Sequence, residues 1–175
     1  MNESTAEPTG TSLGDEEVRT LLALVDRLIP ADGLGPGAIG ARVDRYILRA
    51  LAGPLTALAP VYETGLRAVA AHARDRFGAG PDTLPPADRD RLVADLESGS
   101  VPGADDFFDV LLGHTLEGFL GDPAHGGNHD FAGWRAVGYP GPRLVVGEPE
   151  QRPGFRPPPA GHSTFDLEPF RGGRP

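Results

Sequence analysis

Cysteine is absent from this 175-residue sequence. The absence excludes disulfides, Cys-ligated zinc, iron–sulfur clusters and thiolate nucleophiles. A run of about 18 apolar residues, the length that a membrane-spanning helix needs, is also missing. The first 14 residues lack a basic region, an apolar core and a twin arginine, so we expect no export signal in this chain. The predicted location is the cytoplasm, with co-export alongside a signal-bearing partner left open.

Basic charge is in short supply as well. The chain has a formal net charge of −9 and a pI of about 4.9. Because an acidic surface repels phosphate backbones, nucleic acid is excluded as the expected partner. The glycine motifs of nucleotide-binding loops and the nucleophile elbow of serine hydrolases are missing too. No segment alternates between apolar and polar residues in the manner of a strand.

Apolar residues instead recur at helical spacing, which predicts an all-α fold, an irregular bundle of about five helices. The domain organisation follows as a disordered N-terminus over 1–14, a helical domain over 15–142 and an extended Pro/Gly-rich tail over 143–175. The last helix is apolar on nearly all sides, so we expect it to be the buried centre of the bundle. The predicted helices cover 15–29, 38–52, 56–77, 84–99 and 103–120.

The segment 119–142 is the most informative stretch of the chain. It contains six glycines, three prolines and the only tryptophan. Glycine serves where φ is positive or two backbones approach closely, and proline where φ is fixed, so we expect a loop of specific shape. Gly126 and Gly127 are expected to form a tight turn, and Asn128 to adopt a left-handed conformation or to cap the next element.

Four residues near this loop could carry chemistry. His114 and Glu117 lie three apart on one helix face, and His125 and His129 follow in the loop. Their ligand types suit zinc or non-haem iron, so a metal- or acid/base-dependent enzyme is one interpretation. In the other, which needs no metal, Glu117 and Asp122 accept hydrogen bonds from loop N–H groups and the two loop histidines are exposed.

Trp134, Arg135 and Tyr139 have two interpretations that are compatible. They form either a short amphipathic element with a buried indole or an anchor for a protein partner, since these residue types dominate interface hot spots.

The tail cannot form a helical core, because residues 140–175 contain nine prolines and six glycines. Apolar residues nevertheless interrupt it at wide intervals. This pattern predicts a segment that wraps its own body or a partner, and plain disorder is the alternative. Phe155, Phe165 and Phe170 are the expected anchors.

The order of these features resembles the gluconate 2-dehydrogenase subunit 3 family over residues 21–142. The C-terminal part of the resemblance is the more specific one. The matching stretches are LVDRLIPAD at 24–32, GPGA at 35–38, TLEGF at 115–119, GDP at 121–123, GGN at 126–128, GWR at 133–135 and GYPG at 138–141.

The resemblance implies a helical, cofactor-free, non-catalytic accessory subunit. Such a subunit binds and stabilises the large subunit of a flavin-dependent sugar or alcohol dehydrogenase of the glucose–methanol–choline type, and FAD is expected in that partner. Many family members carry a twin-arginine signal, which this chain lacks. A stand-alone binding protein without an oxidoreductase partner is a third interpretation.

Overall fold

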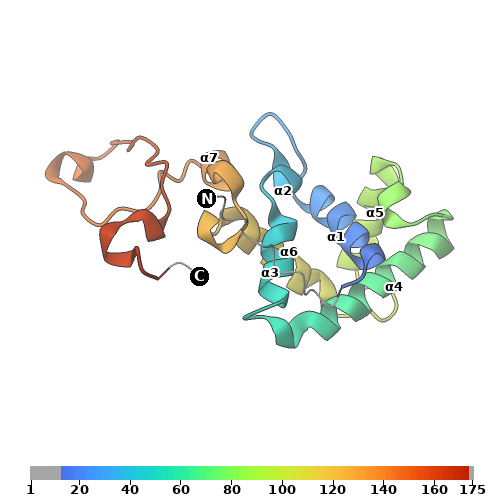
Figure 1. Cartoon of the computed structure of the whole chain (residues 1–175). Helices are drawn as coiled ribbons and strands as arrows, with labels where there is room; N and C mark the ends of the chain where they lie inside the picture. The colour runs from blue at the N-terminus through green and yellow to red at the C-terminus, as the bar shows by residue number, and fades with distance from the viewer. Residues whose placement is uncertain (1–12, 174–175) are drawn as a thin grey trace, which may run out of the picture.

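The computed structural model describes residues 13–173, and this part of the chain is all-α, as predicted (Figure 1). Its α-helices are α1 (Asp15–Leu28), α2 (Gly37–Gly40), α3 (Val43–Leu51), α4 (Ala59–Phe77), α5 (Pro86–Glu97), α6 (Phe107–Leu120) and α7 (Ala132–Ala136). Short 3₁₀ turns connect or follow them: η1 (Thr56–Leu58), η2 (Pro81–Thr83), η3 (Pro123–His125), η4 (His129–Phe131), η5 (Glu148–Gln151), η6 (Thr164–Asp166) and η7 (Glu168–Phe170).

The predicted disordered N-terminus, 1–14, lies outside the described residues except for its last two. Of these, Leu13 is buried in the core, and the Gly14 carbonyl accepts the Val18 N–H at 3.0 Å as α1 begins. None of the helices in the described range is long and apolar enough to cross a membrane.

Helices α1, α3, α4, α5 and α6 enclose one hydrophobic core. Acidic residues occupy the first turn of α1, where they complement the positive end of the helix. Gly78 ends α4 in a left-handed conformation with φ 77°, and its N–H bonds the Arg74 carbonyl. The largest fully buried side chains are Leu21, Leu24, Ile47, Tyr62, Leu66, Leu92, Phe107 and Leu111.

The predicted helix over 38–52 is in fact two helices. Arg42 adopts a left-handed conformation, φ 57°, between α2 and α3. Apolar periodicity continues across the break, because Ala38, Val43 and Ile47 are all buried. Periodicity alone could therefore not reveal the change of direction.

Helix α6 passes through the core on one face only. Phe107 and Leu111 are fully buried. The Phe107 ring packs on Gly65 of α4, where an added Cβ would lie 2.3 Å from the nearest ring atom. Leu116 and Leu120 are 43% and 39% exposed. The prediction that this helix is the buried centre of the bundle is therefore wrong for its outer face.

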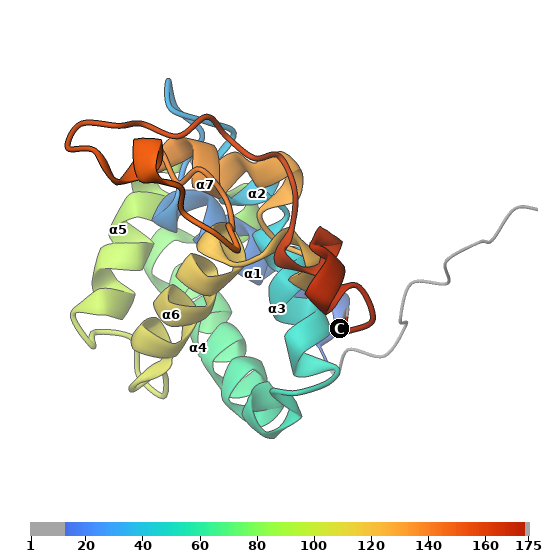
Figure 2. The same ribbon diagram turned by 90° about the vertical axis from the view of Figure 1, so that its left-hand side faces the viewer.

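The tail does not wrap the helical body. It projects to one side as an open loop that follows α7 (Figure 1). Viewed from that side, α6 lies in front of α4, and the tail is also on the side facing the viewer (Figure 2). The loop is closed by a 2.6 Å hydrogen bond from the Ala160 N–H to the Pro140 carbonyl.

Candidate functional site

The glycine-rich segment 119–142 caps the C-terminal end of α6. A helix leaves its last carbonyls without partners inside the helix. Here the Trp134 indole N–H donates to the Leu120 carbonyl at 2.7 Å, and the Asn128 amide donates to the Gly121 carbonyl at 2.8 Å. The side chains of Trp134 and Asn128 thus supply hydrogen-bond donors to carbonyl groups at the C-terminal end of α6.

Asn128 also organises α7. Its side-chain oxygen accepts the N–H of Gly133 at 2.9 Å and that of Trp134 at 3.4 Å. The residue is fully buried and left-handed, φ 46°. Asparagine suits this position because it tolerates a positive φ and carries both a donor and an acceptor.

Two glycines let this segment lie against α6. A Cβ on Gly127 would be 2.1 Å from the Gly118 carbonyl oxygen, and one on Gly133 would be 1.8 Å from that of Phe119. Gly127 therefore serves close backbone approach, whereas Gly126, at φ 104°, makes the turn. The turn is further tied to the bundle by the His129 N–H, which bonds the Ala41 carbonyl at 3.0 Å.

Asp122 connects the glycine-rich segment to the tail. Its carboxylate accepts the Ala124 N–H at 3.0 Å, the Ser163 hydroxyl at 2.6 Å and the Thr164 N–H at 2.7 Å. Burial alone would raise the pKa of this carboxyl, but the hydrogen bonds from Ser163, Ala124 and Thr164 outweigh burial and lower it. The charged form thus holds the tail at one point, where Phe165 also meets the His125 ring edge-on.

Elsewhere the tail covers few of its own apolar side chains. Arg143 pairs with Glu150 and donates to the Pro158 carbonyl, which stiffens the loop. The sequence-predicted anchors Phe155 and Phe170 remain 42% and 44% exposed, whereas Phe165 is partly covered. The other exposed apolar side chains of the tail are Leu144, Val145 and Val146.

Glu117 does not brace the loop as predicted. Its described hydrogen bond comes from the Tyr46 hydroxyl of α3, at 2.7 Å. The Tyr46 ring lies on Gly118, where a Cβ would be 2.8 Å from it. Burial, followed by the bond to Glu117 and its charge, raises the pKa of Tyr46 to about 12.

His114 points into the bundle toward Tyr62. Its Nδ1 lies 2.9 Å from the Tyr62 hydroxyl, and the two rings are parallel with centroids 5.8 Å apart. Burial, with a smaller contribution from the charge of Glu117, raises the pKa of Tyr62. This tyrosine–histidine contact joins α4 to α6 beside the core.

The residues of the metal-site hypothesis are not assembled into one group. His114 faces Tyr62, His125 faces Phe165, and His129 lies 3.5 Å from the Asp130 carboxylate. Within residues 13–173 no cluster of three or more histidine and carboxylate side chains is arranged to hold a metal ion.

A groove of about 700 Å³ lies between the ends of α3 and α6. Its polar groups are already engaged: Glu117 with Tyr46, Asp122 with the tail, and Arg49 with the Ala124 carbonyl at 3.0 Å. These hydrogen bonds hold the polar side chains of the groove in place. Its remaining lining residues are Ala50, Ala52, Gly53, Pro54, Leu55, Gly121 and His125.

The two interpretations of Trp134, Arg135 and Tyr139, a buried element and an anchor for a partner, apply to different side chains. The Trp134 indole is buried and packs edge-on against the Tyr139 ring at 4.9 Å. Tyr139 is 45% exposed, and Arg135 bonds the Asp130 carbonyl at the surface.

Sequence reasoning missed the contacts of Tyr46 and Ser163, because both lie far along the chain from their partners on and after α6.

Comparison with known proteins gives one match. The model of the family described as gluconate 2-dehydrogenase subunit 3 matches residues 15–141. No curated protein and no solved structure matches the chain. The matched range begins at the first residue of α1, ends one residue before the end of the glycine-rich segment and covers most of the chain. The chain therefore belongs to the gluconate 2-dehydrogenase subunit 3 family.

Proposed function

We propose that this chain is a non-catalytic accessory subunit that binds and stabilises the catalytic subunit of a flavin-dependent sugar or alcohol dehydrogenase. The family name supports a subunit role in an oxidoreductase complex. The flavin, of the FAD type, and the glucose–methanol–choline fold belong to the proposed partner. The cytoplasm is the proposed location of this chain.

The projecting tail is the observation that carries the proposal. It holds exposed apolar side chains in an ordered loop that stands away from the helical body (Figure 1). Ordering a backbone costs about 1–2 kcal/mol per residue, and this tail buries little of its apolar surface within the chain. A partner surface that covers Phe155, Phe170 and Val145 would supply the missing burial.

The function is tested by affinity purification of the tagged full-length chain from its native cell. The expected result is a co-purifying chain with the absorbance spectrum of bound flavin and dehydrogenase activity toward a sugar or polyol. The separated small chain is expected to show neither. Purification of the chain alone, or with proteins that bind no flavin, would contradict the proposal and favour the stand-alone binding protein.

A further inference from the structure

The excess negative charge of this protein is concentrated in one segment. Residues 92–134 contain eight acidic residues and no arginine or lysine, whereas the rest of the chain contains 17 acidic residues and 16 arginines. This segment comprises the second half of α5, the loop that follows it, α6 and most of the glycine-rich segment, and only Asp95 of its acidic residues pairs with an arginine within the described residues. The net charge of −9 therefore comes mainly from residues 92–134, the part of the chain that includes α6.

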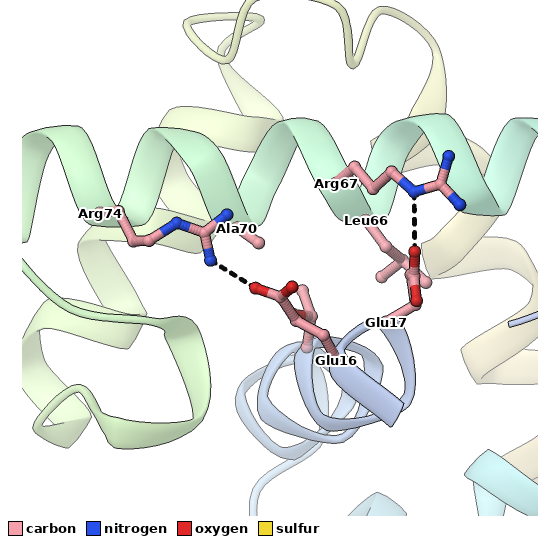
Figure 3. Close-up of a pocket in the computed structure, with 7 residues that line it drawn as sticks. Glu16, Glu17, Leu66, Arg67, Ala70 and Arg74 are labelled. Carbon is pink, nitrogen blue, oxygen red and sulfur yellow. Dashed lines mark hydrogen bonds and ion pairs between the residues drawn. The ribbon is translucent and has the colours of Figure 1, made fainter. Parts of the chain in front are cut away.

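Several acidic residues of α1, η2 and α5 are paired with arginines within the chain. Figure 3 shows two of these ion pairs between α1 and α4: Glu17 accepts from Arg67 at 2.7 Å, and Glu16 pairs with Arg74. Further pairs join α1 to η2 and α5 and link residues within α5: Arg19 with Asp82, Arg27 with Asp90, Arg89 with Asp26 and Arg91 with Asp88.

The acidic residues at the start of α6 are different. Asp105, Asp106 and Asp109 are exposed, and none of them takes part in an ion pair or side-chain hydrogen bond within residues 13–173. Asp106 precedes α6 in a left-handed conformation, φ 54°, without capping the helix. Asp109 complements the positive end of α6, but none of the three carboxylates has a partner side chain within residues 13–173.

An apolar stripe runs along the same helix. Leu112, Leu116 and Leu120 are spaced four residues apart and so lie along one face of α6. The last two are 43% and 39% exposed. The stripe thus combines exposed leucines with unpaired carboxylates at its N-terminal end.

Gly113 lies in the middle of α6, where no close contact within the described residues requires a glycine. A Cβ at this position would meet nothing within 4 Å. Glycine is unfavourable in a helix interior relative to alanine, and two other helical glycines of this protein make room for an aromatic ring. Gly65 admits Phe107 and Gly118 admits Tyr46. By the same logic, Gly113 leaves space for a side chain that another molecule brings.

We propose that the exposed face of α6, formed by Asp109, Leu112, Gly113, Leu116 and Leu120, docks the catalytic subunit, which presents an apolar strip flanked by arginine or lysine. The proposal rests on the accessory function above. Helix α6 and the tail are both on the side that faces the viewer in Figure 2, so one partner can contact both. A second copy of the chain is disfavoured, because like-charged carboxylates would meet.

The test uses two matched substitutions, each of which places an arginine at an exposed leucine. Leu116→Arg alters the α6 face, and Leu34→Arg, in the loop before α2, serves as the control. The probe is the flavoprotein that co-purifies with the wild-type chain, separated and then recombined with each variant. We expect Leu116→Arg to weaken capture by about tenfold or more, as at an interface hot spot, and Leu34→Arg to leave it unchanged.

A third variant guards against misfolding. The Cβ of Gly113→Leu would meet nothing within 4 Å and leucine is a better helix former than glycine, so the free chain should keep its fold by circular dichroism. It should nevertheless weaken capture, because the added side chain fills the space left for the partner. Equal capture by wild type, Leu116→Arg and Gly113→Leu would overturn the α6 inference and leave the accessory function standing.

Two other results would also be decisive. Replacement of Asp105 and Asp109 by asparagine should slow association and flatten its dependence on salt, because rim charges mainly steer encounter. A salt dependence identical to wild type would contradict the charged rim.

Self-association of the wild-type chain that Leu116→Arg abolishes would assign the face to a second copy. A wild-type chain that captures no flavoprotein at all would instead refute the accessory function.

Discussion

At the scale of single residues, one buried amide connects α6 to α7. Asn128 donates to the Gly121 carbonyl and accepts from the Gly133 N–H. Asn128→Ala should lower the free energy of unfolding by about 1–3 kcal/mol for each buried group left unpaired. Urea denaturation measures the loss, with the exposed-site substitution Ser98→Ala as control. A loss no larger than that of the control would show that these bonds contribute nothing to stability.

Tyr46 gives a prediction in alkaline solution. Its pKa is raised to about 12 by burial, the Glu117 bond and the Glu117 charge, in that order. Folding therefore gains stability from neutral Tyr46 that is fully present below the usual tyrosine pKa near 10 and is lost as the pH rises through about 12. Tyrosinate absorbance should show late titration of two tyrosines, Tyr46 and Tyr62, and Tyr46→Phe should remove one of them.

The order of causes makes this prediction sharper. Glu117→Gln should lower the pKa of Tyr46 without returning it to the usual value, because burial is the larger cause. A full return to the usual value would mean that the charge of Glu117 dominates. No change at all would mean that the 2.7 Å bond between the two side chains is absent in solution.

At the scale of elements, two glycines should respond in opposite ways to the same substitution. A Cβ on Gly133 would clash with the Phe119 carbonyl of α6, so Gly133→Ala should destabilise the fold by about 1–3 kcal/mol. Gly113 of α6 faces open space, so Gly113→Ala should stabilise it by about 0.5–1 kcal/mol. Thermal unfolding measures both, and effects of the same sign would contradict this account of helix packing.

The helices differ in how well the sequence predicts them. Apolar spacing and the Gly78 cap identify α1, α4, α5 and α6 because these features are local. The break at Arg42 is missed, since arginine rarely adopts a positive φ and the apolar spacing runs through it. The short helix α7 depends on Asn128 and so on contacts across the fold.

The candidate site was predictable to a smaller extent. Glycine and proline content predicts an ordered loop over 119–142, and asparagine chemistry predicts a special role for Asn128. The partners of Glu117 and Asp122 were out of reach, because Tyr46 lies 71 residues from Glu117 and Ser163 lies 41 residues from Asp122. The sequence also does not reveal that the four candidate metal ligands contact different neighbours. These residues are His114, Glu117, His125 and His129.

At the scale of the whole molecule, Asp122 decides whether the tail stays beside the body. Asp122→Ala removes the acceptor of Ser163 and Thr164, so trypsin should cleave the tail faster after Arg143 and Arg171. The helical content should stay the same, because the core lies elsewhere. Unchanged cleavage, relative to an Asp105→Ala control, would show that other contacts hold the tail.

The attachment of the tail through Asp122 should depend on pH. The pKa of Asp122 is lowered in the folded chain, so its stabilising contribution is present above the usual carboxyl pKa, about 3.8, and is lost as the pH falls through the lowered value. Pepsin, which works in acid, should therefore find the tail increasingly accessible as the pH falls through that range. Accessibility that stays flat in wild type would argue that the charge of Asp122 does not hold the tail.

The central claim is that this chain stabilises a flavin-dependent catalytic subunit through its α6 and tail side. The most direct measurement is the flavin content and thermal stability of that subunit, produced alone, with the full chain, and with a chain that ends at residue 142. We predict that the full chain raises both quantities, and that the shortened chain stays helical but raises them less. A catalytic subunit with the same flavin content and stability in all three preparations would contradict the account.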